Sequence, residues 1–564
     1  MPAPRPLTLC PPAHLDWSRP GTPAAPDFGD IYFSTDGGLN ETRTVFLGGC
    51  GLPESWQETD CFTIGELGFG SGLNFLAAWQ LWRKTKPAGG RLHFVSIEKF
   101  PFDKTDLSQA LSAWPELTDL ADLLLKQWPG RVRGVHRLHF EEVSLTLIHD
   151  DIVPALESLD MKANAWFLDG FSPAKNPDMW SAEVMNKLSA LSAPAARLAS
   201  FTVAGFVRRA LTEAGFEVER KEGFGRKRHR LEAYFPGQAI NSSYGTTLQP
   251  IIIGAGIGGL SLVQAFLRRG IKPKLIEDPD HIAASGNAAA LIKPRFDLQD
   301  RPESRFFLSS YLYALEFYQG FSLFRGIEHR SKNKSETDRH RKLLSQKPLG
   351  ESHLIEGPNG ALFLPQALAI DPLAFKKSIL PKVDFEAKKL DCLPEGKEPV
   401  FLAAGFGARA LLPEWPLRYS RGQVSWAKSD PFFQGAVSYG GYGLNVRDEI
   451  LIGATHGRLV PDGNPFSLNR EDDIKNLDQF NSHLGIKPVP SNTPSRASVR
   501  VTTQDTLPLI GKTRTDIRVL TGLGSRGFVF APLLAEAIVS NYFGEPLPVE
   551  NIVWQKFSAS RLFN

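Results

Sequence analysis

The sequence predicts an α/β protein with two nucleotide-binding domains, because it contains two widely separated patterns of a short β-type run, a glycine loop and an apolar helix. The first pattern is CFTIGELGFGSGLNFLAAWQLW from Cys61, and the second is PIIIGAGIGGLSLVQAFLRRG from Pro250. A chain of 564 residues is also longer than one hydrophobic core usually organises. We therefore predict domains at residues 1–242 and 243–564, joined in the polar linker QAINSSYGTTLQ after a last strand at Leu231–Gly237.

The composition limits the class of protein. A net charge of only +3 means that any contact with nucleic acid must come from local basic patches. The four cysteines do not form a CxxC pair, and their spacing suits neither a zinc site nor a disulfide framework: Cys10, Cys50, Cys61 and Cys392. No metal site is predicted. The sequence lacks a signal-peptide core and a run of about 18 apolar residues, so we expect a soluble, cytoplasmic protein with no membrane contact.

The first glycine loop is GELGFGSGLN. Glu66 ends the predicted strand, and Gly68, Gly70 and Gly72 follow at alternate positions. Glycines let a backbone turn sharply and approach a ligand closely, and the carboxyl edge of a parallel sheet is where such folds bind nucleotides. The next predicted strand, RLHFVSIEKF, ends in Glu98, which is placed to accept hydrogen bonds from ribose hydroxyls. The alternative is a tight turn without a ligand, followed by an acidic surface residue.

Asp169 follows the apolar run AWFL and precedes the turn-forming GFSP, so we expect its carboxylate at the edge of the first sheet. A carboxylate there can orient or deprotonate an amine that faces an activated methyl group. The alternative role for this residue is to cap a helix or turn.

The second glycine loop is a dinucleotide fingerprint in its full context. Gly254, Ala255, Gly256 and Gly259 belong to a GxGxxG pattern directly after the run Ile251–Ile253. The following helix would present its N-terminal amides and dipole to a pyrophosphate. Glu277 ends the next strand, KLIE, where a carboxylate binds ribose hydroxyls. The fingerprint alone does not distinguish FAD from NAD.

Four segments of the first half resemble the methyltransferase half of MnmC, a family of bacterial bifunctional tRNA-modification enzymes: FGDIYFSTDGGLNETRTVFL, GELGFGSGLNF, WFLDGFSPAKNPDMW and EGFGRKRHRLEAYF. The resemblance implies a Rossmann-like methyltransferase domain that uses S-adenosylmethionine. It implies that the following residues line the cofactor site: Glu66, Gly68, Gly70, Gly72, Asn74 and Glu98. Asp169 would be the active-site acid beside the amine. Asp150, after SLTLIHD, is a weaker candidate for the adenine end and could equally be a solvated loop carboxylate.

The second half resembles the D-amino-acid oxidase and glycine oxidase superfamily and the oxidoreductase half of MnmC. The segments that carry this resemblance are AASGNAAALIKPRFD, RYSRGQVSW, GGYGLN, LIGATH, DTLPLIG and TGLGSRGFVFAPLLAEAI. It implies FAD, a Rossmann domain with a mixed-sheet substrate subdomain, and contacts to the flavin cofactor from four positions: Ser285, Asn287, Gly524 and Gly527. Two positions depart from the usual pattern, Ala290 where glycine is frequent and Lys293 where an aromatic residue is common.

The family resemblance implies two reactions at the wobble uridine, position 34, of certain tRNAs. The FAD module would convert 5-carboxymethylaminomethyl-(2-thio)uridine into the 5-aminomethyl form, and the methyltransferase would then make the 5-methylaminomethyl form. Amine oxidation needs a cation that fixes the substrate carboxylate, and Arg526 is the leading candidate because guanidinium binds carboxylate through paired hydrogen bonds. Arg421, Arg496 and Arg500 are the alternatives.

A tRNA substrate also requires positive surface. A dense basic cluster close to Arg208 and Arg209 could neutralise phosphates or could be a solvated loop: Arg226, Lys227, Arg228 and Arg230. The polar stretch Glu328–Gly350 is predicted to be an exposed excursion and a weaker second patch. Two rival functions remain. One is a free-amino-acid or sarcosine-type oxidase fused to an unrelated methyltransferase, and the other is an idle RNA-binding scaffold, which the intact glycine loops argue against.

Overall fold

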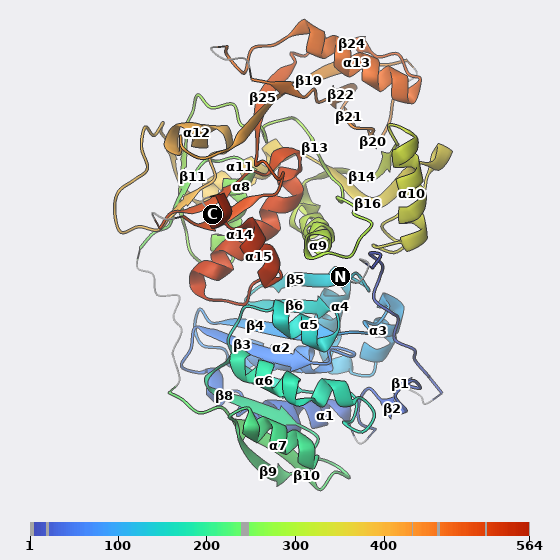
Figure 1. Cartoon of the computed structure of the whole chain (residues 1–564), viewed down its shortest axis with the longest axis vertical. Helices are drawn as coiled ribbons and strands as arrows, with labels where there is room; N and C mark the ends of the chain where they lie inside the picture. The colour runs from blue at the N-terminus through green and yellow to red at the C-terminus, as the bar shows by residue number, and fades with distance from the viewer. Residues whose placement is uncertain are drawn as a thin grey trace. The chain divides into compact units, whose positions relative to one another are not determined.

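The computed structural model describes residues 5–18, 22–35, 37–238, 248–430, 432–459, 463–513 and 516–562 (Figure 1). The chain forms two compact units. The N-terminal unit comprises residues 9–245 and 540–552, and the C-terminal unit comprises residues 1–8, 246–539 and 553–564. The predicted boundary near residue 242 lies outside the described residues.

The N-terminal unit is built on an eight-stranded sheet in the order β5-β6-β4-β3-β7-β8-β10-β9. Its five central strands are parallel: β6 (Val143–His149), β4 (Arg91–Glu98), β3 (Cys61–Leu67), β7 (Ala163–Leu168) and β8 (Ser192–Ser200). The outer strands pair antiparallel: β5 (Gly134–Phe140), β10 (His229–Tyr234) and β9 (Glu217–Glu222). The predicted strand at Leu231–Gly237 corresponds to β10.

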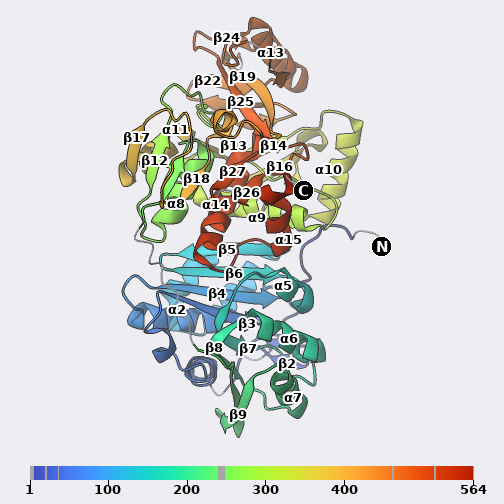
Figure 2. The same ribbon diagram turned by 60° about the vertical axis from the view of Figure 1, so that its left-hand side comes forward.

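Helices cover both faces of this sheet, which is why its central strands are almost continuously apolar. One core packs helices α2 (Leu73–Thr85), α3 (Lys104–Leu111) and α4 (Thr118–Gln127) on one face. A second core packs α5 (Ile152–Ser158), α6 (Ala182–Leu191) and α7 (Gly205–Glu213) on the other face, as Figure 2 shows.

The order of connections fixes where a ligand can bind. From β3 the chain continues to β4 and β6 on one side, and it then returns to place β7 and β8 on the other side of β3. The carboxyl ends of β3 and β7 therefore border the point where the direction of winding changes. Open α/β sheets bind ligands at this point.

Short elements complete the unit: β1 (Ala24–Ala25), β2 (Asp30–Ile31), α1 (Gly38–Glu41), the π-helix η1 (Thr42–Gly48) and the 3₁₀ turns η2 (Glu54–Trp56), η3 (Pro115–Leu117) and η4 (Pro177–Trp180). The β1–β2 segment lies against the loop that follows β7. The backbone N–H of Ser172 donates to the Asp30 carboxylate at 3.1 Å, and the ring of Phe28 stacks on Phe171 with centroids 4.3 Å apart.

Residues 540–552 pack within the N-terminal unit although they lie near the end of the sequence. The Arg137 guanidinium donates to the carbonyl oxygen of Pro546 at 2.6 Å, and Nε2 of His93 lies 3.7 Å from a carboxylate oxygen of Glu545. The backbone N–H of Leu547 donates to the carbonyl of Asp160 at 3.2 Å. His93, Arg137 and Glu545 are all buried, so the segment closes part of this core.

The C-terminal unit contains a six-stranded sheet in the order β17-β12-β11-β18-β27-β26. Its first five strands are parallel and the last is antiparallel: β17 (Asp384–Ala387), β12 (Lys274–Glu277), β11 (Ile251–Ile253), β18 (Val400–Leu402), β27 (Arg518–Thr521) and β26 (Leu509–Lys512). Helix α8 (Ile257–Leu267) follows β11, and the turn η9 (Gly524–Arg526) leads into α14 (Gly527–Phe543).

A second, eleven-stranded sheet belongs to the same unit, and it mixes parallel and antiparallel pairs. Its strands are β13 (Ala290–Ile292), β14 (Ser322–His329), β15 (Ile355–Glu356), β16 (Leu362–Ile370), β19 (Arg418–Lys428), β20 (Ala436–Ser438), β21 (Tyr442–Val446), β22 (Glu449–Gly453), β23 (Gly457–Arg458), β24 (Val489–Pro490) and β25 (Arg496–Thr502). The predicted α/β fold with a mixed-sheet subdomain is confirmed.

The remaining helices of the C-terminal unit are α9 (Pro302–Phe317), α10 (Lys334–Gln346), α11 (Pro372–Ile379), α12 (Ala408–Leu411), α13 (Arg470–Leu484) and α15 (Asn551–Phe557), the last of which begins in residues of the other unit. Short 3₁₀ turns join them: η5 (Gln319–Phe321), η6 (Pro358–Gly360), η7 (Leu380–Lys382), η8 (Gly405–Gly407) and η10 (Ala559–Leu562). Among the described residues, no helix has the length and apolar character needed to cross a membrane.

Candidate cofactor and catalytic sites

Asn74 joins two of the predicted acidic residues at the carboxyl edge of the first sheet. Its amide Nδ2 donates to Oε1 of Glu66 at 2.9 Å and to Oδ2 of Asp169 at 2.8 Å. Helix α2 begins at Leu73, directly after the glycine loop, so the side chain of Asn74 lies in its first turn beside the ends of β3 and β7. The hydroxyl of Thr42 donates to Oδ1 of Asn74 at 2.8 Å and fixes the orientation of the amide.

The pKa of Asp169 is shifted in the direction that suits an acid–base group. Burial raises the pKa of its carboxyl to about 6, while the N–H of Gly170 and the amide of Asn74 act in the opposite direction. Two charged side chains of the unit also act on it, since Glu41 raises this pKa and Lys227 lowers it. At neutral pH the group is therefore a carboxylate that can accept a proton close to pH 6.

Glu66 is the more deeply buried of the two acids, with only 1% of its surface exposed. Burial raises the pKa of Glu66 well above its usual range, and the nearby Asp169 adds to this. The hydroxyl of Ser96 donates to its Oε2 at 2.6 Å. Sequence reasoning missed Ser96 and Thr42, because a serine inside a strand and a threonine in an irregular N-terminal segment give no signal of their own.

Glu98 holds the glycine loop from the neighbouring strand. Its Oε2 accepts the N–H of Gly70 at 2.9 Å, and its Oε1 accepts the N–H of Phe100 at 2.8 Å. Gly68 has φ +86°, and a Cβ there would lie 3.1 Å from Cα of Gly170 in the loop after β7. Gly70 and Gly72 also have positive φ. The loop is therefore a tight cradle beside Asp169, which fits close approach of a nucleotide-type cofactor.

Asp150 lies at the end of β6, apart from this cluster of contacts. It forms an ion pair with Arg133 and accepts the N–H of Asp151 at 3.0 Å. In these contacts the Asp150 carboxylate has a structural role, because it joins Arg133 to the backbone at this edge of the sheet. A contact to the adenine end remains a prediction.

The second glycine loop places helix α8 tightly against β11. Gly254 has φ +102°, and a Cβ at this position would lie 2.7 Å from the carbonyl oxygen of Ala403. A Cβ on Gly259 would lie 1.8 Å from the carbonyl oxygen of Gly254, so only glycine allows this helix to start so close to the strand. The N–H of Ile257, at the start of α8, donates to the hydroxyl of Ser285 at 3.0 Å. The predicted residues Gly256 and Ser285 thus meet at the helix N-terminus.

A cavity of about 490 Å³ opens beside this helix and is lined by Ala255, Glu277, Ser285, Arg496 and Phe528, among others. Glu277 lies at the end of β12, as predicted, but both of its carboxylate oxygens accept hydrogen bonds from Nζ of Lys376, at 2.5 and 2.7 Å. Sequence reasoning missed Lys376, which comes from α11. The cradle, the helix N-terminus and the acid at the strand end together fit the dinucleotide part of FAD.

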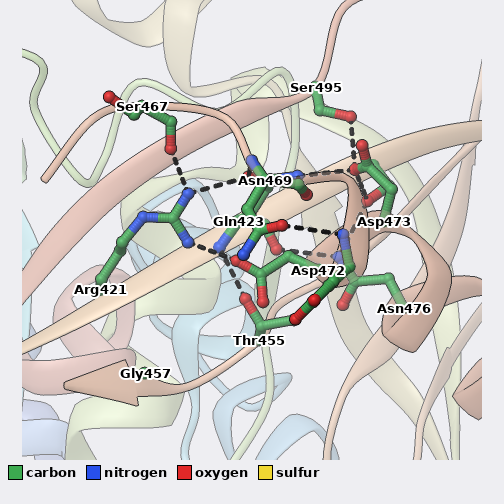
Figure 3. Close-up of polar contacts among 12 residues, drawn as sticks. Arg421, Gln423, Thr455, Gly457, Ser467, Asn469, Asp472, Asp473, Asn476 and Ser495 are labelled. Carbon is green, nitrogen blue, oxygen red and sulfur yellow. Dashed lines mark hydrogen bonds and ion pairs between the residues drawn. The ribbon is translucent and has the colours of Figure 1, made fainter.

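The candidate arginines differ in what they already bind. Arg421 donates to the carboxylate of Asp472, to Oε1 of Gln423 at 2.9 Å and to the carbonyl of Ser467 (Figure 3). Arg500 donates to the carbonyl of Thr455 at 3.2 Å. Arg421 is therefore part of a structural network, and its guanidinium is already occupied.

The network around Arg421 ties helix α13 to strand β19. Asp473 accepts hydrogen bonds from Gln423 and Ser495 at 2.8 and 2.7 Å (Figure 3). It also accepts one from the hydroxyl of Ser425 at 2.6 Å. Ser495 lines the cavity next to Arg496. Arg496 in turn donates to Oδ1 of Asn287 at 2.8 Å and to the carbonyl of Ala283 at 2.5 Å. The predicted flavin-contacting segment around Asn287 is thus held by Arg496.

Arg526 is in a different situation. Within the described part of the chain, its guanidinium has no hydrogen bond or ion pair with a protein group. Burial, together with the nearby charges of Arg295 and Arg339, lowers the pKa of Arg526 to about 10. The residue ends the turn η9 between Gly524 and Gly527. A buried cation without an acidic partner is suited to hold an incoming carboxylate.

The predicted basic cluster lies on and beside the turn between β9 and β10. Arg226, Lys227 and Arg228 are exposed, whereas Arg230 forms an ion pair with Glu232 at 2.7 Å. Nζ of Lys227 lies 3.0 Å from a carboxylate oxygen of Glu41 and 4.2 Å above the ring of Phe201. Lys227 and Glu41 both act on the pKa of Asp169, so the charge of this turn is felt at the Asp169 carboxylate.

Comparisons with known proteins match two separate parts of the chain to two different families. A family model described as S-adenosyl-L-methionine-dependent methyltransferase matches residues 115–236, and one described as FAD dependent oxidoreductase matches residues 383–540. The tRNA 5-methylaminomethyl-2-thiouridine biosynthesis bifunctional protein MnmC of Maricaulis maris (strain MCS10) is 41% identical over 95% of this chain and 93% of its own length. The protein of the same name from Caulobacter vibrioides is 40% identical, over 96% of each chain.

Among solved structures, iminodiacetate oxidase (IdaA) from Chelativorans sp. BNC1 is similar with a TM-score of 0.45 and 17% identity. The similarity covers 55% of this chain and 98% of that one.

Proposed function

Because the chain belongs to the MnmC family of bifunctional tRNA 5-methylaminomethyl-2-thiouridine biosynthesis proteins, we propose that its two sites act in turn on one nitrogen of the wobble uridine in tRNA. The chain combines an S-adenosylmethionine-dependent methyltransferase with an FAD-dependent oxidoreductase. In the first reaction, the carboxymethylamine and water give a primary aminomethyl group and glyoxylate, with two electrons passing to FAD. In the second, the primary amine receives a methyl group.

The observation that carries the methyl-transfer proposal is the Asn74 amide bridge between Glu66 and Asp169. Bound S-adenosylmethionine supplies an electrophilic methyl group. The Asp169 carboxylate accepts a hydrogen bond from the incoming ammonium and takes its proton, which frees the lone pair of the nitrogen. Asn74 holds that carboxylate in place, and the buried Glu66 keeps the amide from rotating away.

Arg526 is our candidate for orienting the other substrate. Bound FAD supplies the two-electron acceptor for oxidation of the carbon–nitrogen bond. The guanidinium of Arg526 would bind the carboxylate of the carboxymethyl group through paired hydrogen bonds and so fix the adjacent carbon. This role is supported by the lack of another partner for Arg526 among the described residues and by its place after Gly524 in the family's glycine-rich turn.

The exposed basic turn formed by Arg226, Lys227 and Arg228 is our candidate for contacting tRNA phosphates. Its support is that these three cationic side chains are exposed on the same unit as Asp169 and that the charge of Lys227 acts on the pKa of Asp169. A tRNA substrate also agrees with a cytoplasmic location.

The test is mass analysis of wobble nucleosides after incubation of purified protein with undermodified tRNA. Without S-adenosylmethionine, we expect the aminomethyl nucleoside to accumulate. When S-adenosylmethionine is present, we expect the methylaminomethyl nucleoside to form. A parallel assay should offer free glycine and sarcosine. Turnover of these amino acids without any change in tRNA would refute the proposal and support a small-molecule oxidase instead.

A further inference from the structure

Three potential metal ligands that have no role in the sites described above meet in the C-terminal unit. They are His329, which ends β14, and Glu336 and His340 on helix α10. One ligand atom from each lies within 4.8 Å of the other two. The spacing of four residues between Glu336 and His340 puts both side chains on the same face of the helix.

The outer contacts of His329 and Glu336 orient their free ligand atoms toward each other. Nδ1 of His329 lies 2.7 Å from the hydroxyl of Ser438 and 3.3 Å from its carbonyl oxygen, while Nε2 lies 3.9 Å from Oε1 of Glu336. Oε2 of Glu336 accepts the N–H of Lys332 at 2.7 Å, which leaves Oε1 for a ligand. Metal-binding histidines and carboxylates are typically held by outer hydrogen bonds of this kind.

His340 provides an independent observation. Only 1% of its surface is exposed, and among the described residues neither ring nitrogen has a hydrogen bond of good geometry, although the backbone of Gly360 acts on its pKa as a weak partner. Buried polar side-chain atoms without a partner are rare in proteins and need an explanation. A ligand that binds an imidazole nitrogen would provide it.

We propose that His329, Glu336 and His340 bind a transition-metal dication of the Zn²⁺ type, with a fourth position open to water or an anion. Two imidazoles and one carboxylate form a donor set that suits Zn²⁺, whereas Mg²⁺ and Ca²⁺ prefer oxygen ligands throughout. Tetrahedral bonds of about 2.0–2.1 Å hold ligand atoms roughly 3.3 Å apart, so small side-chain rotations would close the site. The positive charges of Lys293 and Arg526 act on His329 and would also repel the metal ion, so an anionic fourth ligand that offsets them is favoured.

The experiment uses full-length, FAD-loaded protein that has been treated with a chelator and desalted. Zn²⁺ is titrated against a chromophoric competitor, and Tm is measured with and without Zn²⁺. The wild type should bind one Zn²⁺ per chain at this site and gain Tm, while His340→Gln, His329→Gln and Glu336→Gln should weaken this binding by about 100-fold or more. His353→Gln is the matched control, since it removes another largely buried imidazole of the same unit but should bind Zn²⁺ like the wild type.

Glu336→Gln is the variant that we expect to fold normally, because Glu336 is partly exposed and glutamine keeps an acceptor for the N–H of Lys332. Weaker Zn²⁺ binding in this variant therefore cannot be attributed to misfolding. Loss of Zn²⁺ binding in the three variants but not in His353→Gln supports the site. Absence of Zn²⁺ binding in the wild type, equal binding in Glu336→Gln, or an equal gain in Tm with Mg²⁺ overturns it.

Discussion

At the scale of single residues, the Asn74 bridge explains why two acids can share the edge of one sheet. Nδ2 of Asn74 gives one hydrogen to Glu66 and one to Asp169, so it separates two carboxyl groups that would otherwise repel each other. Burial then leaves Asp169 with a pKa of about 6, close to the pH at which it would work.

Asp169→Asn should lower the rate of methylation by roughly 10²–10⁴-fold, because the variant keeps the size of the side chain but cannot accept a proton. Removal of the carboxymethyl group should continue, so tRNA with the bare aminomethyl group should accumulate in nucleoside mass analysis. The exposed Asp178, in the turn that follows the same loop, offers the control Asp178→Asn, which should methylate normally. Near-normal methylation in Asp169→Asn would reduce Asp169 to a structural role.

The pH dependence of methylation should report the same carboxyl. Its pKa is raised to about 6, so the carboxylate form is present above pH 6 and is lost as the pH falls through 6. Asp169 takes the proton of the bound ammonium, so this transfer adds no further pH dependence near pH 6. The logarithm of the single-turnover rate should therefore rise with a slope of about one below pH 6 and level off above it. Asp169→Asn should show a slope of one throughout, and an unchanged break near pH 6 in that variant would assign the break to another group.

Arg526→Met should lower kcat/KM for carboxymethyl removal by about 10–100-fold, because a charge-assisted hydrogen bond contributes about 1.5–3 kcal/mol. Most of the change should fall on KM if the arginine binds substrate. Arg526→Lys keeps the charge without the paired geometry and should be intermediate. Methylation of aminomethyl tRNA, measured in the same preparations, should be unaffected. An unchanged kcat/KM in Arg526→Met would contradict this role of Arg526 and would make Arg496 the next candidate for binding the substrate carboxylate.

Residues close to a motif in the sequence could be predicted, whereas their partners from distant segments could not. Glu66 and Glu98 follow from the first glycine loop and the next strand, and Asn74 follows from the family resemblance. The structure brings Glu66 and Asn74 together with Asp169. Lys376 could not be predicted to pair with Glu277, because this contact depends on how α11 packs and not on any local pattern. The cluster of His329, Glu336 and His340 was also missed, although the spacing ExxxH within a helix was a signal available in the sequence.

At the scale of elements, the fit of helix α8 against β11 determines whether a dinucleotide can bind. The helix begins where Gly259 packs against the carbonyl of Gly254, and its first N–H groups point to the end of the sheet at which Ser285 lies. Any atom added at Gly259 must push the helix away from the strand.

Gly259→Ala should therefore yield protein that has lost most of its FAD. The added Cβ would lie 1.8 Å from the carbonyl oxygen of Gly254, which no side-chain rotation can relieve. The wild type should be yellow, and the variant should lack the flavin absorbance while still methylating aminomethyl tRNA. Gly320→Ala is the matched control, since a Cβ there meets nothing within 4 Å. A yellow Gly259→Ala protein would contradict this account of the loop.

Elements with a local signal were predicted well, and those set by long-range pairing were not. The strands β3 and β11 and the helices after them were recognised from their glycine loops. The pairing of β19 with β22, β23, β24 and β25 depends on segments far apart in the sequence, so no local periodicity indicates it. The stretch Glu328–Gly350, predicted as an exposed excursion, contains helix α10, whose His340 and Leu343 are buried.

At the scale of the whole molecule, the segment 540–552 affects the stability that we expect of the methyltransferase unit when it is produced without the oxidoreductase unit. We still predict that a protein ending at residue 242 folds and binds S-adenosylmethionine. However, it lacks Glu545 and Pro546, which contact the buried side chains of His93 and Arg137. The truncated protein should consequently be less stable than the intact N-terminal unit.

We expect the protein ending at residue 242 to gain about 5–10 °C in Tm when a peptide of residues 540–552 is added at saturating concentration. The estimate assumes roughly 2–3 kcal/mol for the restored contacts and about 2–4 °C per kcal/mol at this chain length. A peptide with the same composition in scrambled order is the control. Equal Tm values with both peptides would show that the segment contributes little, and an insoluble truncated protein would show that the unit cannot fold alone.

The late position of residues 540–552 has a consequence for how the protein is made. A ribosome completes residues 9–245 early, but the segment that closes their core begins only 295 residues later (540 − 245). A nonsense codon between residues 245 and 540 would therefore release a methyltransferase with part of its core uncovered, a state that cellular proteases remove readily. The arrangement ties the abundance of the methylating activity to complete translation of the oxidase that supplies its substrate.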